Sequence, residues 1–410
     1  MISKISFENR ITELAVIFSI VSFTPNNSIS KMCTIIMYLL WMAVAVFKLL
    51  NKTIKVDRTV KAMIAAYIIW FVCTKVFYLL NFYPSSGLGV ASYLRYCIIF
   101  YVIGLNYQIS ENDSVKKLVF SFFIGQLILM LTLIPNIRSL IEAYQLFGAK
   151  NQMGQMLGIG IILELFILPD YFKSVILKAV YYVCGLVSFV VLLILHSRTP
   201  LIALIVVGTL YFLQIKDKTV KHYMTAAVVI LMIGFVINKL GGIAYIMTLF
   251  NIPNRSENFD LNNLTSGRLE FYKEAINDFI ESPIWGIGAF AYVDNFIFNI
   301  LRCGGLLLAV IIIPLSYGKL FSGYRMSVRV LDSFDSIYID KKPENIHLAF
   351  TLLKSMIVFY FVISLMEGYP PLGPGTSVFF MWIVLGLSYN IWNNDIYDKL
   401  KSDRIGDEKS

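Results

Sequence analysis

Charged side chains are scarce in this sequence of 410 residues: Asp, Glu, Lys and Arg make up 15% of it, against about 25% in an ordinary soluble domain. Hydrophobic residues make up 58%, above the usual ~45–50%. A soluble fold of this length has too little polar surface to cover so many apolar side chains, and the same richness excludes an intrinsically disordered chain. The composition therefore indicates a membrane protein.

Patterns for disulfides and metal ions are also missing. The five cysteines all lie in apolar stretches and no two of them are spaced C-x-x-C, which excludes a disulfide framework or a zinc site. The three histidines are far apart and form no ligand motif. The N-terminus lacks the small-residue cleavage pattern of a secretory signal peptide. The net charge of +9 does not require a nucleic-acid partner, because Lys and Arg mark the cytoplasmic loops of membrane proteins.

The sequence instead contains separate apolar stretches of about 16–22 residues, the length that crosses a bilayer. We expect each to be a helix, because a backbone exposed to lipid must satisfy its own hydrogen bonds. The fold class predicted is an all-α polytopic membrane protein with one large extracytoplasmic loop. Its twelve predicted spans are residues 11–25, 32–48, 61–81, 91–106, 118–135, 152–169, 175–195, 200–214, 223–240, 293–316, 348–366 and 375–392.

The distribution of Lys and Arg predicts the orientation of these spans. Most of them fall on the side of the N-terminus, in segments that include a basic loop at 317–347 and a tail at 393–410. Positive charge gathers on the cytoplasmic side, so both termini are predicted to be cytoplasmic. The chain then divides into nine spans over 1–240, a large outer loop at 241–292, and three spans over 293–392.

The second half of the outer loop has the period of an amphipathic helix, from about Gly267 until Pro283 ends it. Arg268 is the only charge on its apolar arc. An arginine in a first turn can simply reach into water. The interpretation that we favour is that Arg268 points into the membrane domain, at an anion.

Three more arginines lie near membrane level on the predicted outer side: Arg95, Arg198 and Arg302. A charge at the bilayer centre costs about 2.5–3.5 kcal/mol on insertion scales, so such residues usually have a partner or a task. Arg95 and Arg302 fit equally well with side chains that reach lipid phosphates. Arg198 sits in a turn of five residues that holds it near the membrane surface, and its planar guanidinium suits phosphate oxygens. We therefore predict that Arg198 binds an anion.

Four short segments, in this order along the chain, resemble motifs of the O-antigen polymerase and O-antigen ligase superfamily. They are FGAKNQMG at 147–154, SRTP at 197–200, GR at 267–268 followed by PIWGIG at 283–288, and DNFIFNILRCGG at 294–305. The first 140 residues match only in hydropathy. The ligase branch usually carries His at the position of Asp294, whereas an acidic residue is common in the polymerase branch, so the resemblance favours a polymerase.

The resemblance implies a glycosyltransferase of the bacterial cell membrane. It would polymerise the polyprenyl-pyrophosphate-linked oligosaccharide repeat units of a capsule, O-antigen or exopolysaccharide on the outer face. The implied partners are the lipid-linked oligosaccharides, the lipid bilayer, and a chain-length regulator and a flippase of the same pathway. An acceptor hydroxyl attacks the anomeric carbon of the donor, and the lipid pyrophosphate leaves.

The residues fit that chemistry as follows. Arg198 and Arg268 are predicted to stabilise the leaving pyrophosphate, because fixed charge is usually the largest catalytic term. Asp294 is predicted to orient or deprotonate the acceptor hydroxyl, although an Asp at this position also suits the N-cap of the following helix. No cofactor and no metal are expected, because no D-x-D or carboxylate cluster is recognisable on the outer face. The candidate substrate-binding residues are Arg95, Lys150, Asn151, Asn295, Arg302, Gly286 and Gly288.

Two other functions remain open. Twelve helices also fit a lipid-linked oligosaccharide flippase or another secondary transporter, but such proteins tend to show repeated halves, and no repeat is visible here. The ligase activity, which moves a finished glycan to a different acceptor, is the second alternative.

Overall fold

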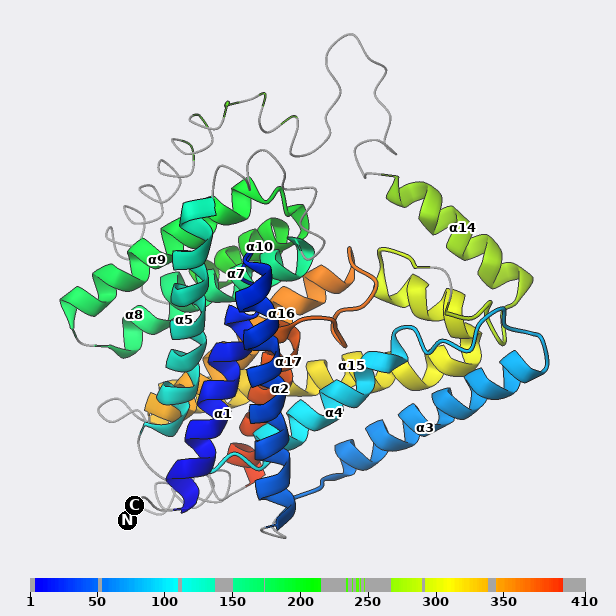
Figure 1. The fold of residues 1–410 in the computed structure, drawn as a ribbon, viewed down its shortest axis with the longest axis horizontal. Coiled ribbons are helices and arrows are strands. Elements are labelled where there is room, and N and C mark those ends of the chain that lie inside the picture. Colours follow the sequence, from blue (N-terminus) through cyan, green and yellow to red (C-terminus); the bar gives the residue numbers. More distant parts are fainter. Residues whose placement is uncertain are drawn as a thin grey trace.

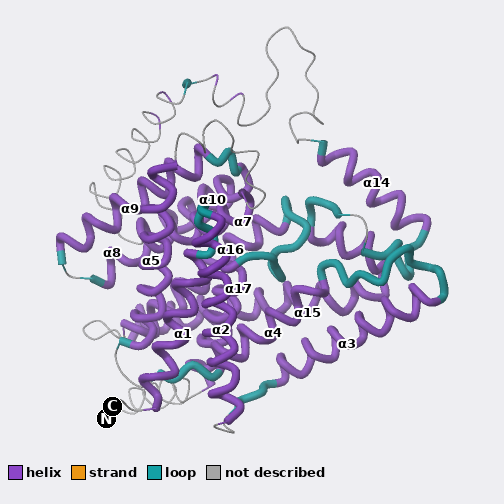
Figure 2. Tube along the Cα trace, in the orientation of Figure 1, coloured by secondary structure: helices purple, strands orange, loops and turns teal. Residues whose placement is uncertain are grey.

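The computed structural model describes residues 4–50, 54–109, 113–136, 150–172, 174–214, 267–289, 292–337 and 344–393, with isolated positions between 234 and 247. All regular structure in these ranges is helical (Figure 2). The helices before residue 140 are α1 (Lys4–Val21), α2 (Asn27–Leu50), α3 (Arg58–Leu79), α4 (Ala91–Leu105), α5 (Ser114–Leu133) and the short 3-10 helix η1 (Ile134–Asn136).

The later helices carry the motif segments. They are α7 (Lys150–Ile161), which continues as the π-helix η3 (Ile162–Ile167) and α8 (Leu168–Tyr171), then α9 (Val175–Ile194), α10 (Arg198–Gln214), α14 (Arg268–Glu281), α15 (Phe296–Ile337), α16 (Glu344–Ser364) and α17 (Thr376–Ile391). The amphipathic helix predicted in the outer loop is confirmed as α14, which lies beside the start of α15 (Figure 1).

The architecture is that of a multi-pass membrane protein. Seven of the described helices are long and apolar enough to cross a bilayer, and three shorter apolar helices, α4, α10 and α17, accompany them. The predicted span at 223–240, the polar half of the outer loop and the tail at 394–410 lie largely or wholly outside the described residues. The count of twelve spans therefore stays a prediction.

Helices α4 and α17 cross with their backbones in contact. A Cβ atom added to Gly104 of α4 would lie 2.0 Å from the Ile383 carbonyl oxygen, and one added to Gly386 of α17 would lie 2.1 Å from that of Tyr101. Small residues at a crossing let membrane helices approach closely. This crossing fixes the last helix against the first half of the chain.

The beginning of α1 and the end of α17 lie at the same end of the bundle. The side-chain amide of Asn9 donates to the Gln108 carbonyl at 2.8 Å, and that of Asn390 donates to the neighbouring Tyr107 carbonyl at 2.8 Å. The first and the last described helices thus meet at one end, while the prediction that both termini of the chain are cytoplasmic stays a prediction.

The predicted boundary between the tenth span and the basic loop at 317–347 falls inside a helix, and where this helix leaves the membrane stays a prediction. Helix α15 begins at Phe296, is interrupted at Gly305, and continues to Ile337. Its basic second half still buries one apolar face, which includes Leu320, Met326 and Val330. The hydropathy of a sequence indicates where a helix passes from apolar to polar surroundings. It does not indicate where the helix ends, and α15 continues into its polar segment.

Candidate active site

Five segments that are distant in sequence meet around the carboxyl group of Glu367. Glu367 follows α16, and its Oε1 atom lies 3.3 Å from Asn151 Nδ2, 3.4 Å from Thr199 Oγ1 and 3.7 Å from Arg268 Nη2. Arg268 Nε in turn donates to Asp294 Oδ2 at 3.1 Å. We call these five residues the Glu367 cluster.

Arg268 lies on the side of α14 that faces the membrane helices, as its position on the apolar arc predicted. Gly267 precedes it with a φ of 80°, in the left-handed region that favours glycine, and so lets the chain turn into the helix. The anions that Arg268 meets in this structure are the two carboxyl groups of the protein, Asp294 and Glu367. Its side chain is 24% exposed and that of Asp294 is 29% exposed, so a ligand can reach both.

Asp294 is not the N-cap of α15. The cap is its neighbour Asn295, whose Oδ1 accepts the backbone N–H groups of Ile297 at 3.0 Å and Phe298 at 3.1 Å. Asn295 also donates to the Leu365 carbonyl at 3.0 Å. Both ends of its side-chain amide thus make contacts within the protein, and its contact with substrate stays a prediction. The alternative that sequence reasoning left open for Asp294 is therefore excluded.

Two tyrosines surround the carboxyl groups. The hydroxyl of Tyr272, one turn after Arg268 on α14, donates to the Asp294 carbonyl at 2.8 Å. The Tyr292 hydroxyl accepts the Gly368 N–H at 3.0 Å and lies near both carboxyl groups; burial raises the pKa of this tyrosine, and the two carboxyl groups raise it further. The loops before α15 and after α16 are thus tied side by side, which sets the distance between Asp294 and Glu367.

Sequence reasoning missed Glu367. Hydropathy places it in a short loop rich in Gly and Pro between two apolar stretches, where it is the only charged residue between 365 and 375. A lone carboxylate on the predicted outer side was the signal available, and none of the recognised motifs contains it. Glu367 is 6% exposed, a depth that a loop position does not suggest.

Burial changes the proton affinity of Glu367. The pKa of this carboxyl is raised to about 7: burial is the largest cause and the nearby Asp294 adds to it, whereas Arg268, Thr199 and Tyr292 partly oppose the shift. A carboxyl group with such a pKa gains and loses its proton close to neutral pH. Groups of this kind gather at functional sites.

The turn that carries Arg198 is fixed against α7. Ser197 packs on Gly154, where an added Cβ would lie 2.4 Å from the serine hydroxyl oxygen. His196 adopts a φ of 49°, which few residues other than glycine do. The contact between Ser197 and Gly154 brings the SRTP and KNQMG segments together, as we expect for two parts of one site.

The same turn is electrically positive. Burial lowers the pKa of the His196 imidazole, and the neighbouring charges of Lys150 and Arg198 lower it further. Lys150 begins α7 and Arg198 begins α10, and the next residues of these helices, Asn151 and Thr199, touch Glu367. Asn151 therefore belongs to the cluster and Lys150 and Arg198 border it, although the contact of these three residues with a substrate stays a prediction.

Arg302 has a partner within the protein. Its Nε donates to Asp278 Oδ2 at 2.5 Å, its Nη2 lies 3.8 Å from Glu274 Oε2, and its side chain is only 11% exposed. It ties α14 to α15 and so holds Arg268 over Asp294. The predicted contact of Arg302 with substrate stays a prediction.

Gly286 and Gly288 approach the backbone of the chain itself. Where α15 is interrupted, Ile287 N–H donates to the Arg302 carbonyl at 2.9 Å and Gly288 N–H donates to the Cys303 carbonyl at 3.0 Å. Gly286 has a φ of 69°, and a Cβ there would lie 2.6 Å from the Arg302 oxygen. These backbone contacts explain why glycine is needed at both positions without a substrate, and the contact of the two glycines with substrate stays a prediction.

Arg95 lies apart from these contacts. It is exposed on α4, donates to the Tyr96 hydroxyl at 3.1 Å and lies over that ring at 4.8 Å. Among the described residues, no hydrogen bond or ion pair connects Arg95 with the Glu367 cluster. Its predicted contact with substrate stays a prediction without support from the arrangement of the site.

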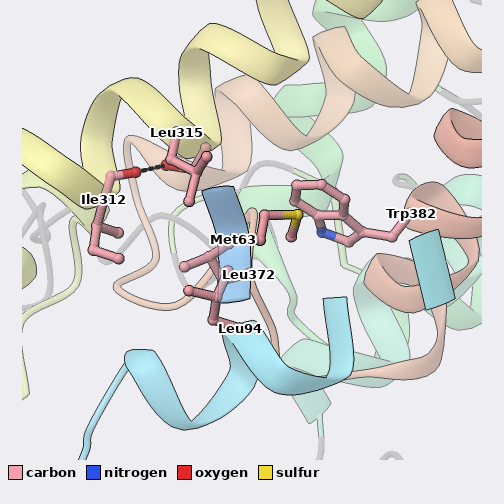
Figure 3. A pocket seen from close by; sticks show the side chains of 7 residues that line it. Met63, Leu94, Ile312, Leu315, Leu372 and Trp382 are labelled. Carbon is pink, nitrogen blue, oxygen red and sulfur yellow. Dashed lines mark hydrogen bonds between the residues drawn. The ribbon is translucent and has the colours of Figure 1, made fainter. Parts of the chain in front are cut away.

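A separate apolar pocket lies between α3, α4, α15 and α17 (Figure 3). Met63, Leu94, Leu372 and Trp382 line it, and its one hydroxyl group, on Ser316, donates to the Ile312 carbonyl of its own helix at 2.6 Å. It offers no charge for a phosphate and no acceptor for a sugar proton. The Glu367 cluster is therefore the better candidate for the chemistry.

Two carboxyl groups lie close together here, although no such cluster was recognisable in the sequence. In the described part of the chain, no group of three or more His, Cys, Asp or Glu residues is placed to hold a metal ion. Metal independence stays a prediction.

One comparison with known proteins matches this region. Residues 183–319 match the family model described as O-antigen ligase, and no curated protein matches the chain. The matched segment contains Arg198, Arg268 and Asp294, whereas Asn151 and Glu367 lie outside it. The predicted resemblance is thereby confirmed for this part of the chain: residues 183–319 carry the sequence features of the O-antigen ligase family, which points to an enzyme that transfers glycans in a membrane.

Proposed function

We propose that the protein polymerises polyprenyl-pyrophosphate-linked oligosaccharide repeat units on the outer face of the cell membrane. The observation that carries the proposal is the accessible pair of Arg268 and Asp294, beside the turn of Arg198. One cation for a phosphate and one acceptor for a proton lie together, within the segment that matches the family. A glycosyl transfer to a hydroxyl group needs both.

In the proposed reaction, the acceptor hydroxyl oxygen forms a bond to the anomeric carbon of the donor glycan. The bond from that carbon to the pyrophosphate oxygen breaks, and its electrons leave with the pyrophosphate. Asp294 takes the proton of the hydroxyl, a task that is typically worth about 10²–10⁴-fold in rate. Arg268 and Arg198 stabilise the charge on the leaving pyrophosphate with donors already in place.

Arg268 has two tasks in this scheme. Without substrate it pairs with Asp294. A pyrophosphate carries more charge than a carboxylate and offers more acceptor oxygens to the guanidinium. We infer that substrate draws Arg268 toward the phosphate, which leaves Asp294 available to the acceptor hydroxyl.

The ligase reaction is the second candidate, because O-antigen ligase is the description of the matching family. It would use the same donor and the same leaving group. The two functions differ only in the acceptor, which is a single lipid-linked repeat unit for a polymerase and a different glycolipid for a ligase. Asp294 in place of the usual His favours the polymerase.

The test is transfer by the purified protein in lipid nanodiscs, with lipid-linked repeat units as the only glycan. A ladder of products on a gel supports polymerisation, and a product that forms only when a second glycolipid is added supports ligation. A protein that moves lipid-linked units across vesicles and links none contradicts both and indicates a flippase. The same assay with a chelator tests metal independence, which a loss of product would overturn.

A further inference from the structure

The carboxyl group of Glu367 is surrounded by hydrogen-bond donors from three separate helices. The amide of Asn151, the hydroxyl of Thr199 and the guanidinium of Arg268 all lie 3.3–3.7 Å from the same oxygen atom, Oε1. These residues belong to α7, α10 and α14. A single atom thus joins the three segments that border the proposed substrate site.

This donor set suits an ionised carboxylate. An ionised carboxylate only accepts hydrogen bonds, whereas a protonated carboxyl is also a donor. Arg268 can only donate, and an ion pair with its guanidinium is stronger than a neutral hydrogen bond. The contacts of Glu367 are therefore complete only when it carries a negative charge.

Glu367 itself is too deep to touch a glycan, because its side chain is 8% exposed, against 24% for Arg268 and 29% for Asp294. Any effect on the reaction must pass through the residues that it holds. Arg268 is shared between the two carboxyl groups, Nε with Asp294 and Nη2 with Glu367. The contact of Arg268 with Glu367 can therefore remain while its contact with Asp294 is replaced by one with substrate.

We propose that ionised Glu367 is the positioning residue of the site: it anchors Arg268 by one end of the guanidinium while the other end passes from Asp294 to the pyrophosphate of the donor. This rests on the proposed function. The anchor keeps Arg268 at the site when its pair with Asp294 opens. It also ties the guanidinium to Asn151 and Thr199, and so to the starts of α7 and α10, which carry Lys150 and Arg198.

The anchor depends on pH. The titratable and charged groups around Glu367 are Arg268 and Tyr272 of α14, and Asp294 and Tyr292 of the loop before α15, with Lys150, His196 and Arg198 on the adjoining turn and helix starts. Burial raises the pKa of Glu367 to about 7. Below this pH the group is neutral and its hold on Arg268 is lost, and above it the ion pair forms. The transfer rate should therefore rise with pH through about 7.

The test compares Glu367→Gln with the wild-type protein in nanodiscs, from pH 5.5 to 8.5 (roughly one and a half units on each side of the pKa). Gln keeps the shape and can still accept the neutral hydrogen bonds, but it carries no charge at any pH. We expect the transfer rate at high pH to fall about 10–100-fold and the rise near pH 7 to disappear. Glu281→Gln, on the exposed last turn of α14, is the matched control and should keep the profile of the wild type.

Two further variants guard against loss of the fold. Glu367→Asp keeps the charge at a shorter reach, so it should restore the rise with pH at a reduced rate. Thr199→Val removes a donor that stabilises the ionised form and should move the rise to higher pH. Thermal unfolding of each purified variant shows whether it is folded.

An infrared titration of the protein without substrate gives a result that does not depend on transfer. The titration is made in a Glu164→Gln background, because Glu164 of η3 is a second buried carboxyl group that would contribute to the same band. In that background, a protonated carboxyl band that disappears near pH 7 should be present when Glu367 is intact, also with Glu281→Gln, and absent with Glu367→Gln. If that band survives in Glu367→Gln, or if the rise in rate near pH 7 does, the anchor is disproved. If the wild type shows the band but transfers no glycan, the proposed function fails while the ionisation of Glu367 stands.

Discussion

Two of the ion pairs among the described residues have similar chemistry but different surroundings. Lys48 of α2 and Glu8 of α1 form a pair whose side chains are 10% and 7% exposed, and Lys48 also donates to the Asn106 carbonyl at 2.7 Å. Arg268 and Asp294 are 24% and 29% exposed and leave one side open. The first pair is enclosed and joins helices, whereas the second can exchange a partner for a ligand.

The difference shows how the same pairing can serve the fold or the reaction. A buried pair that loses one partner leaves an uncompensated charge, so it cannot open without a large cost. An accessible pair costs little to open, because water or a ligand replaces the partner. Of these two pairs, Arg268–Asp294 is therefore the one suited to a catalytic cycle, and four substitutions can test this comparison.

The largest effect is expected from Asp294→Asn. Asn keeps the shape but cannot take a proton, so we expect transfer to fall by about 10²–10⁴-fold. Folding should be unaffected, because Asn295 caps α15. The assay is the product ladder at equal amounts of folded protein.

Asn295→Ala is the matched control for Asp294→Asn. It removes the cap and should lower the stability of the fold by about 0.5–2 kcal/mol, while the protein that remains folded still transfers glycan. A full ladder from Asp294→Asn would show that Asp294 takes no part in the reaction. The Arg268–Asp294 pair would then be structural, like the Lys48–Glu8 pair.

Lys48→Met should lower the stability of the fold and leave transfer unchanged, the reverse of what we expect for Asp294→Asn. It leaves Glu8 buried and unpaired, so we expect the free energy of unfolding to fall by about 3–5 kcal/mol, measured by thermal or denaturant unfolding in detergent. Transfer per folded molecule should be retained. Lys31→Met, on the exposed start of the same helix, should change little, and equal stability of the two variants would show that the enclosed pair does not support the fold.

Arg198→Lys tests whether the open site needs more than positive charge. A point charge cannot make the planar contact of a guanidinium with phosphate, so we expect about a 10–100-fold loss of transfer with the charge retained. The ladder at several donor concentrations measures the loss. A polymer yield close to that of the wild type would show that only the charge of Arg198 matters.

The smallest effect is expected from Gly286→Ala, which disturbs the support of the open pair. The positive φ and the close approach to the Arg302 carbonyl disfavour a side chain, and we expect a loss of about 1–2 kcal/mol in stability. Gly318→Ala in the same helix bundle, where an added Cβ meets nothing within 4 Å, is the control. Equal unfolding midpoints for the two variants would contradict the packing role of Gly286.

Much of the fold could be predicted from the sequence because helix positions in a membrane follow from local composition. Long apolar stretches must form helices where no water can satisfy the backbone. The period of residues 268–281 and Pro283 define α14, and the arc that carries Arg268 is fixed by 3.6 residues per turn. The order of the motifs also indicated which helices would carry the site.

The arrangement of the site depended on contacts between residues far apart in the chain. Glu367 reaches Asn151 and Thr199 across 216 and 168 residues, and no local pattern records such a distance. The sequence left open whether Asp294 caps α15, because adjacent Asp and Asn cap about equally well, and only the geometry selects Asn295. The sequence by itself determined the helices and the side on which Arg268 points. Only the tertiary structure decided that two carboxyl groups share this arginine, because burial and hydrogen bonding act between segments that folding brings together.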